Sequence, residues 1–439
     1  MKSRVFGFPQ MTAFVIAAMI GTGVFTSLGL QVKAIPSVPA VILLWIVGGV
    51  ASLTGALAYA ELGAAHPRSG GEYHLLGTIY TPTLGFIAGV ATLVAGLAAP
   101  IALSAVAFGK YAQNLIALPE PVFTVGVILL ATIVHSVNVR VGATLHSAVT
   151  YFNVALILVF IVAAFLAPTP APSLIPTAYD FSLILTPAYA VSFVFVSYAY
   201  LGWNTSVYVI DEIKDVQKNL PRSVITGVIV VTALYVVLNY SFLKVASIQA
   251  LSGKLDVGYI AAQGMFAERG ALVMSALIAL VLLASVSSYA VLGPRVWNVM
   301  GEDYTLLRFA AVKNKHGVAV RAFWLQAVIA ITIVLTSSFE AILIYTGFLL
   351  NVFNMLAVVG VIILRRKHPE LPRPYKVWGY PVTPLIFAAI SFWMAASVVM
   401  ERPKESLAVL ATFGLGFVLS SRRGLQAKPT SEDSPEKQP

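Results

Sequence analysis

Long runs of apolar residues, separated by short polar stretches, recur along nearly the whole chain. Each run holds about 20 residues, which as a helix crosses the roughly 30 Å hydrocarbon layer of a bilayer. The runs lie near residues 8–33, 38–63, 81–109, 121–139, 144–167, 183–210, 221–246, 267–299, 318–337, 339–364, 380–401 and 404–421. A membrane barrel would instead show alternating segments of about 10 residues. The pattern therefore predicts an all-α membrane protein with about twelve transmembrane helices.

Two of these segments are interrupted in their middle by small residues, at corresponding positions in the two halves of the chain. Gly21 and Gly23 interrupt the first segment, and Gly202 interrupts the sixth. A helix that breaks inside a bilayer leaves backbone N–H and C=O groups unpaired, and each such group costs several kcal/mol. Such breaks persist where they line a binding site, so the matched pair predicts a buried solute site of the kind that transporters use.

Composition and charge agree with membrane insertion and add an orientation. Apolar residues make up 59% of the chain, charged residues make up 10%, and the mean hydropathy is +0.87. If successive segments cross the membrane in opposite directions, 21 of the 28 lysines and arginines lie on the same side of the membrane as the two termini. This excess predicts cytoplasmic termini in a multi-pass protein of the plasma or inner membrane. The net charge of +10 then reflects topology and contact with anionic lipid, with no need for a nucleic-acid partner.

The chain contains no cysteine, which excludes disulfides, thiol catalysis and a disulfide-linked partner subunit. Its six histidines show no metal-ligand spacing, so neither a metal nor another cofactor is expected. Residues 1–421 are expected to form a single transporter domain. Residues 422–439 are polar and proline-rich, and are expected to form a disordered cytoplasmic tail.

Four groups of motifs, in order along the chain, carry a resemblance to a known family. They are Ile20–Phe25 in the first segment, Tyr59–Gly63 with Ser69–Tyr73 after the second, Tyr198–Asn204 with Asp211–Arg222 around the sixth, and Gly293–Val296 at the end of the eighth. The chain resembles the amino acid–polyamine–organocation (APC) superfamily of permeases, and is most similar to its L-type amino acid transporter branch. The resemblance implies a five-plus-five inverted repeat with helices 1 and 6 broken. Repeat one would span about 8–167, repeat two about 183–364, and two extra helices about 380–421.

The first break offers the chemistry that an amino acid zwitterion needs. The N–H groups near Thr22, Gly23 and Val24 lie at the positive end of a half-helix, where a carboxylate is favoured. Carbonyls freed by both breaks would face the ammonium group. The expected substrate-binding residues are Ala18, Met19, Gly21, Thr22, Gly23, Val24, Tyr198, Ala199, Leu201 and Gly202. The alternative role for Gly21 and Gly23 is close helix–helix packing.

Aromatic side chains surround the second break. In the transporters that the chain resembles, an aromatic residue at the position of Tyr198 closes over the substrate, so Tyr198 is expected to act as a gate. Trp203 is a second candidate for gating, and plain packing is the alternative for both rings. Asn204 is expected to hydrogen-bond either the unwound backbone or the substrate.

The fifth segment departs from the family pattern. The L-type branch carries a lysine there, where sodium-coupled relatives hold an ion, and this chain has Asn153. A neutral amide cannot replace that positive charge. Asn153 with Ser285, Ser287 and Ser288 of the eighth segment is therefore a candidate ion or coupling site. The alternative, which we favour, is that the amide and hydroxyls hydrogen-bond one another across the bundle.

Acidic residues in or near the segments are few. Glu61, at the end of the second segment, is expected to pair with Arg68 or to cap a helix. Asp211 and Glu212 are expected to anchor the loop after the sixth segment. Because these acids lie at segment ends, none of them is expected to relay protons.

Together these features favour a transporter over other classes. An enzyme would need a catalytic set in mid-segment, and a channel would need a pore loop or a ring of charges; neither is evident. Side-chain specificity is expected from segments 3, 6, 8 and 10, including Asn351 and Asn354, with no evident acid to hold a cationic side chain. The prediction is a secondary-active permease or exchanger that moves a neutral amino acid by alternating access. The alternatives are transport of a cationic amino acid or polyamine, or a transporter-like amino acid sensor.

Overall fold

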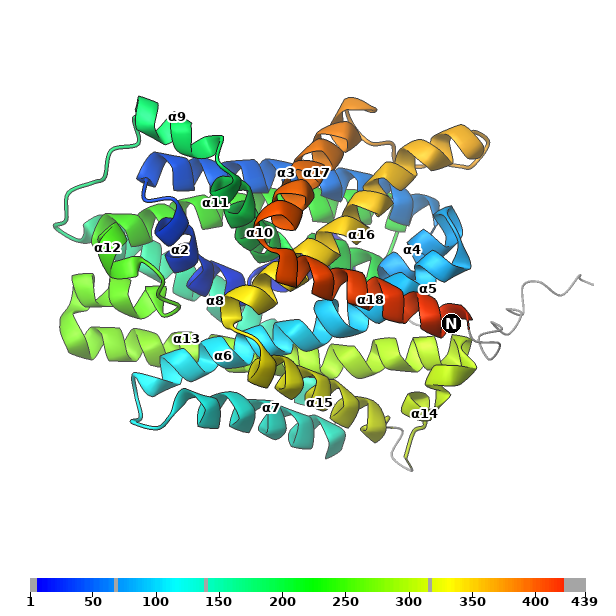
Figure 1. The fold of residues 1–439 in the computed structure, drawn as a ribbon, viewed down its shortest axis with the longest axis horizontal. Helices are drawn as coiled ribbons and strands as arrows, with labels where there is room; N and C mark the ends of the chain where they lie inside the picture. The colour runs from blue at the N-terminus through cyan, green and yellow to red at the C-terminus, as the bar shows by residue number, and fades with distance from the viewer. Residues whose placement is uncertain (1–5, 67–69, 138–140, 315–317, 422–439) are drawn as a thin grey trace, which may run out of the picture.

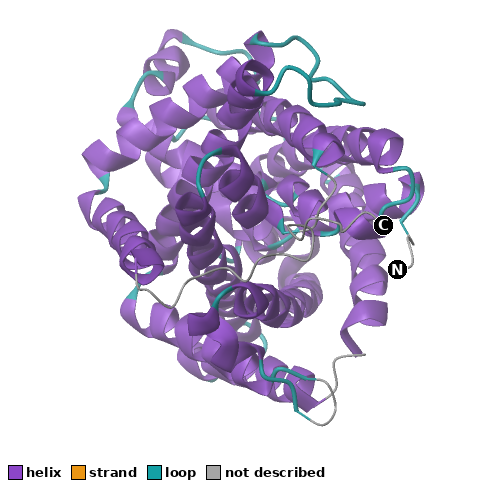
Figure 2. Cartoon of the chain, turned by 90° about the vertical axis from the view of Figure 1, so that its right-hand side faces the viewer, coloured by secondary structure: helices purple, strands orange, loops and turns teal. Residues whose placement is uncertain are grey.

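The computed structural model describes residues 6–66, 70–137, 141–314 and 318–421, and this part of the chain consists of helices joined by loops (Figure 2). The helices are α1 (Phe8–Met19), α2 (Thr22–Ala34), α3 (Val38–Ala65), α4 (Gly71–Ile79), α5 (Pro82–Ala91), η1 (Thr92–Ala98), α6 (Ala99–Gln113), α7 (Glu120–Val137), α8 (Val141–Leu166), α9 (Ala178–Ile184) and α10 (Pro187–Tyr200). They continue with η2 (Trp203–Tyr208), η3 (Ile210–Glu212), α11 (Val216–Val245), α12 (Ile248–Leu251), α13 (Val257–Asp303), η4 (Thr305–Leu307), α14 (Arg308–Ala311), α15 (Val320–Thr336), α16 (Phe339–Lys367), α17 (Val382–Glu401) and α18 (Pro403–Ser421).

Each of the twelve predicted apolar segments is occupied by helix within the described residues. Eight helices there are long and apolar enough to cross a membrane, or nine if α9 and α10, which bend by 72°, count as one span. Tyr151–Leu166 of α8 and all of α15 form shorter apolar helices. The prediction of an all-α membrane protein is confirmed. The disordered tail was predicted for residues 422–439, which lie outside the described residues.

Both predicted helix breaks are present. In the first segment α1 ends at Met19 and α2 begins at Thr22, so Ile20 and Gly21 join them in extended conformation. In the sixth segment α10 ends at Tyr200, and a tighter helical turn, η2, begins at Trp203. Leu201 and Gly202 lie between them, and Gly202 has a φ of +135°, which only glycine adopts readily.

Two other irregularities were not predicted from the sequence. The third segment contains a wide helical turn, η1, between α5 and α6. Wide turns of this kind re-aim the side chains that follow them and are frequent at functional sites. The eighth segment begins earlier than predicted, at Val257, and kinks at Ala267, the residue at which the predicted segment starts.

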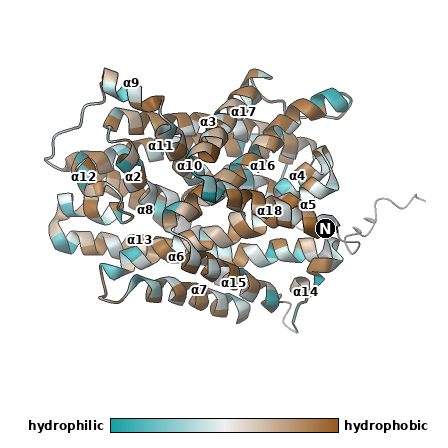
Figure 3. Ribbon diagram, in the orientation of Figure 1, coloured by the Kyte–Doolittle hydropathy of each residue, from teal (hydrophilic) through white to brown (hydrophobic). Residues whose placement is uncertain are grey.

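The broken helices lie inside the bundle. Half-helix α10 packs against α2, α3, α16 and α17, while α13 packs along α6 (Figure 1). Apolar residues dominate the helices seen in Figure 3, and large apolar side chains such as Leu166, Phe392 and Met400 are exposed on the outside. An exposed apolar exterior around a core that contains polar groups is typical of a protein solvated by lipid.

Candidate functional site

The first break is held open by a tyrosine from α11. The Tyr235 hydroxyl donates a hydrogen bond of 2.7 Å to the Met19 carbonyl and also interacts with the backbone of Gly21. The N-terminus of α2 has no side-chain cap. Because the first N–H groups of a helix have no partner within it, this turn presents free donors and a positive dipole end to whatever lies beside it.

The two breaks touch each other, and glycine is required at both contacts. A Cβ atom on Gly202 would lie 2.4 Å from the carbonyl carbon of Ala18, and one on Gly23 would lie 2.7 Å from Cα of Ala199. Close packing, the alternative role for these glycines, is therefore part of what Gly23 does. Gly21 differs, because a Cβ there would meet nothing within 4 Å.

A cavity of about 820 Å³, open solvent included, lies where the breaks meet. It is lined by all the predicted substrate-binding residues except Val24: Ala18, Met19, Gly21, Thr22, Gly23, Tyr198, Ala199, Leu201 and Gly202. Val24 is fully buried and does not line it. The structure thus brings residues about 180 positions apart in sequence together around one cavity. The two helix breaks had predicted a buried site of this kind.

Several polar groups at the breaks already have a partner. The Thr22 hydroxyl lies 2.5 Å from that of Ser104 on α6, so the two share a hydrogen bond. The Tyr198 carbonyl accepts from the N–H of Leu201 at 3.0 Å. The Met19 carbonyl, as described above, accepts from Tyr235. A carbonyl oxygen has two lone pairs, so each of these oxygens can still accept a second hydrogen bond from a ligand.

The two aromatic gate candidates lie on different sides of the broken helix. Tyr198 is 9% exposed and lines the cavity. Trp203 points away from it, and packs edge-on against Tyr59 and Phe387 at ring-centre distances of 4.9 and 6.2 Å. Trp203 therefore has the position of a packed core ring, because neither it nor its ring partners Tyr59 and Phe387 line the cavity that Tyr198 lines.

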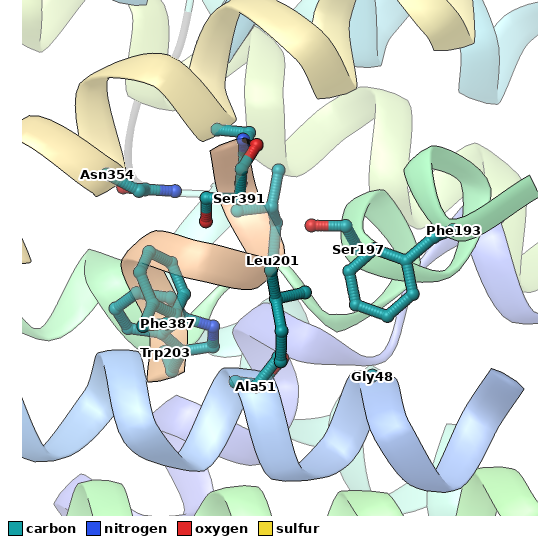
Figure 4. A pocket seen from close by; sticks show the side chains of 12 residues that line it. Gly48, Ala51, Phe193, Ser197, Leu201, Trp203, Asn354, Phe387 and Ser391 are labelled. Carbon is teal, nitrogen blue, oxygen red and sulfur yellow. Dashed lines mark hydrogen bonds between the residues drawn. The ribbon is translucent and has the colours of Figure 1, made fainter. Parts of the chain in front are cut away.

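Trp203 instead lines a second, smaller cavity between α3, α10, α16 and α17, with an empty volume of about 330 Å³ (Figure 4). The Ser197 hydroxyl and the Asn354 amide point into it from opposite sides. Asn351 lines it as well, and donates to the Ser391 carbonyl at 3.2 Å. The two asparagines expected to contribute to specificity therefore lie behind the broken helix, away from the main cavity.

The walls of the main cavity contain residues that the sequence did not single out. They come from η1, α6, α13 and α16, and include Leu97, Pro100, Tyr289, Leu292, Val296 and Leu350. Most are ordinary apolar residues within long apolar runs, which carry no sequence signal of their own. Their placement depends on the wide turn η1 and on how α13 packs against the breaks.

The most important omission from the sequence analysis is Glu72, an acidic residue in the cavity wall. Its carboxyl group is buried, and Oε1 accepts from the Tyr59 hydroxyl at 3.0 Å and from Asn204 Nδ2 at 2.8 Å. The Tyr208 hydroxyl donates to Oε2. The sequence analysis found no evident acid to hold a cationic side chain, whereas Glu72 is an acid that lines the cavity. Glu72 lies just after a polar loop in sequence, and its carboxyl group is in contact with side chains of both α3 and η2.

Asn204 has its two hydrogen bonds within the protein. Its side-chain oxygen accepts from the backbone N–H of Gly202 at 3.2 Å, and its nitrogen donates to Glu72. Of the two roles considered for this residue, the structure supports bonding to the unwound backbone. Asn204 thereby fixes the shape of the second break and ties it to α4.

The other intramembrane acid, Glu61, is neutralised by arginines. Arg365 makes two hydrogen bonds to its carboxylate at 2.9 and 2.6 Å, and Arg373 approaches to 3.6 Å. Its expected partner Arg68 lies outside the described residues. His66 follows the last residue of α3, close to this cluster. Its pKa is lowered by burial first, and then by Arg373 and His368 nearby. Glu61 thus joins α3 to α16 as part of a structural ion cluster.

Among the described residues, the hydrogen bonds that the three predicted coupling serines make run to partners other than Asn153. Ser285 and Ser288 each donate to a carbonyl on their own helix, at 3.2 and 2.9 Å. Ser287 shares a hydrogen bond of 2.6 Å with the buried His135 on α7. Asn153 is buried on α8, and its side-chain oxygen has no hydrogen-bond partner among the described residues.

Comparison with known proteins gives one family and several curated relatives. The sequence pattern of a family described as "Amino acid permease" matches residues 6–418. The chain is 23% identical over 405 residues to the human b(0,+)-type amino acid transporter 1, covering 89% of this chain and 82% of that protein. It is 27% identical over 408 residues to the rat large neutral amino acids transporter small subunit 2, covering 87% and 74%. It is also 28% identical over 421 residues to a methylthioribose transporter of Bacillus subtilis, covering 89% and 87%.

Proposed function

This chain belongs to the amino acid permease family, and we propose that it moves a neutral amino acid across a cell membrane by alternating access to the cavity at its two helix breaks. It is a multi-pass membrane transporter and not an enzyme. The observation that carries the proposal is the meeting of both breaks at one cavity, which residues from α1, α2, α10 and η2 line together.

The proposed site recognises the part that all amino acids share. The uncapped N-terminus of α2 offers N–H groups and a positive dipole end to the substrate carboxylate. Gly21 leaves open space beside these donors. Carbonyl oxygens of Ala18 and Leu201, which line the same cavity, would accept from the ammonium group. Both charged ends of a zwitterion would thus be held by backbone, leaving the side chain to the cavity wall.

The wall opposite the breaks favours an uncharged side chain. Leu97, Pro100, Leu292, Val296 and Leu350 supply an apolar surface that would hold an apolar or small substrate side chain. The carboxyl group of Glu72 already receives three hydrogen bonds, so it has little capacity left for a cationic substrate. Glu72 is also the one observation that favours the second candidate, transport of a cationic amino acid or polyamine.

Alternating access requires that the site be closed from one side at a time. Tyr198 lines the cavity beside the break in the sixth segment, and we propose that its ring closes over the bound substrate. The distribution of lysine and arginine supports cytoplasmic termini in a plasma or inner membrane. Because the chain has no cysteine, it cannot be disulfide-linked to a partner subunit.

The test is counterflow in proteoliposomes loaded with one unlabelled compound and diluted into its labelled form. The panel contains neutral and cationic amino acids, a polyamine and methylthioribose. We expect transient accumulation of neutral amino acids and none in vesicles without protein. Accumulation of methylthioribose or of polyamine alone, by protein that is folded and correctly reconstituted, would overturn the proposal.

A further inference from the structure

The short helix α9 has the reverse of the pattern expected for a helix that faces water. Its single buried residue is the acid Asp180, while the aromatic side chains of Tyr179 and Phe181 are 55% and 58% exposed. In water a surface helix turns its apolar side chains toward the protein and its charged side chains outward. An acid that faces the protein, between two rings that face away from it, indicates that α9 has apolar surroundings.

The exposed apolar side chains continue on both sides of α9. Residues 168–187 contain one charged residue, Asp180. Five large side chains of this stretch are between 50% and 88% exposed, and we call them the α9 patch: Leu174, Ile175, Tyr179, Phe181 and Leu185. Single exposed apolar residues are ordinary on a protein surface, whereas a group of them marks contact with a partner or a membrane.

The direction of α9 places it along the membrane surface. Its axis is bent by 72° from that of α10, which follows it and forms the first half of the sixth segment. A helix nearly perpendicular to a membrane-crossing helix runs close to the plane of the bilayer. Figure 1 shows α9 at the edge of the bundle, where it packs against α3 and α10.

A hydrogen bond to α3 sets the level of α9 relative to the bilayer. The Asp180 carboxylate accepts from the hydroxyl of Ser37, which is the N-cap of α3. At 1.5 Å per residue, the 28 residues of α3 extend about 42 Å, which matches a bilayer with its headgroup regions included. The start of α3 therefore lies at the level of the headgroups, and α9 lies there with it.

The apolar exterior of the bundle reaches this end of α3. Leu43, Ile46 and Val50 are exposed, and their spacing of three and four residues puts them on one face of the helix. The first of them, Leu43, lies about 9 Å along the helix axis from Ser37. The stripe that faces lipid on α3 therefore begins within two turns of the point at which α9 is held.

We propose that residues 174–185 form an interfacial anchor, which inserts the α9 patch into the lipid leaflet farther from the N-terminus. Tyr179 and Phe181 suit this depth, because amphipathic segments with aromatic residues bind where headgroups meet acyl chains. The capping box of Thr177 with Asp180, together with the bond to Ser37, holds α9 in place from the protein side.

The anchor has a consequence for the second helix break. Because α9 leads directly into α10, lipid contact at α9 fixes the outer end of the half-helix whose other end, at Tyr200, precedes the break. Lipid contact does not depend on which solute is carried, so this inference is independent of the proposed function.

The test uses single cysteines, which the cysteine-free chain allows without any background labelling. Phe181→Cys and Leu185→Cys proteins are labelled with an environment-sensitive fluorophore and reconstituted into phosphatidylcholine vesicles. The vesicles carry a nitroxide quencher on the acyl chain, either near the headgroup or near the chain end, and iodide serves as the quencher in water. Both labels should lose emission most strongly with the shallow nitroxide and little with iodide, as expected for a depth of about 5–10 Å into the boundary between headgroups and acyl chains.

Two positions serve as matched controls, and thermal unfolding checks that each labelled protein is folded. Gln249→Cys is exposed on α12, at the same end of the bundle as α9 (Figure 1), and should be quenched by iodide. Ile46→Cys, on the exposed face of α3, should be quenched by nitroxide and not by iodide. Quenching of the α9 labels by iodide alone would overturn the inference. So would the absence of both kinds of quenching, which would show that a second copy or another protein covers the patch.

Discussion

Gly21→Ala is the substitution that separates substrate binding from folding at the first break. Gly21 lines the cavity, and its Cβ would meet no atom within 4 Å. Its φ of −146° and ψ of −152° are extended backbone that alanine can adopt. Replacing glycine with alanine at a compatible position stabilises by about 0.4–1 kcal/mol, while alanine is a poorer N-cap by a similar amount. The two effects offset each other, so the free energy of unfolding should change little.

The effect on binding should be much larger. The new methyl group would occupy the space beside the free N–H groups at the start of α2, where the substrate carboxylate is proposed to bind. A hydrogen bond to a charged group contributes about 1.5–3 kcal/mol. Because about 1.4 kcal/mol corresponds to a factor of ten in affinity, the loss of one such bond weakens binding by roughly 10- to 100-fold.

The assay is the concentration dependence of initial uptake in proteoliposomes, with thermal unfolding of the purified protein as the folding check. Gly126→Ala on α7 is the matched control, because its Cβ also meets nothing within 4 Å and it lines neither cavity. Gly23 is less informative, since even alanine there would clash with the backbone of Ala199. A Gly21→Ala protein with the wild-type KM and turnover would refute the site.

Three further predictions follow from individual contacts. Tyr198→Ala should reduce turnover more than it weakens binding, while Tyr198→Phe should be mild because the ring is kept; equal turnover for Tyr198→Ala and the wild type would leave the ring with a packing role only. Wild-type uptake should not respond to external Na⁺ at fixed ionic strength, and Asn153→Lys should be impaired or unchanged; saturable activation of the wild type by Na⁺ would contradict this. Lys244→Met should lower the free energy of unfolding in detergent by about 1–2 kcal/mol, and with it the Tm. The reason is that the Lys244 ammonium group donates to the carbonyls of Ala164 and Ala167, at 2.8 and 2.9 Å, at the end of α8. An unchanged Tm would show that water replaces these bonds.

The features that could be predicted from sequence are those with a local cause. Long apolar runs need a lipid environment, and glycines inside two of them allow the breaks at Gly21 and Gly202. The cavity residues on these breaks follow from the breaks themselves. The apolar wall residues, such as Leu292 and Leu350, could not be found, because they resemble every other leucine in a long apolar helix.

The features that sequence reasoning missed depend on packing between distant elements. Trp203 follows the unwound residues, so the direction of its ring could not be inferred from helical periodicity. Ser287 bonds His135 instead of Asn153 because α7 approaches α13 at that level. Glu72 follows a polar loop, where an exposed acid is the ordinary expectation, and it is buried among Tyr59, Asn204 and Tyr208, which come from distant parts of the chain.

The central claim is that an amino acid binds between the two helix breaks, and a structure of the protein saturated with a transported amino acid tests it most directly. The account predicts density in the cavity, with the substrate carboxylate within about 3.2 Å of backbone nitrogens at the start of α2 and the ring of Tyr198 over the ligand. Substrate bound instead in the smaller cavity beside Ser197 and Asn351, with the α2 N-terminus unoccupied, would contradict it.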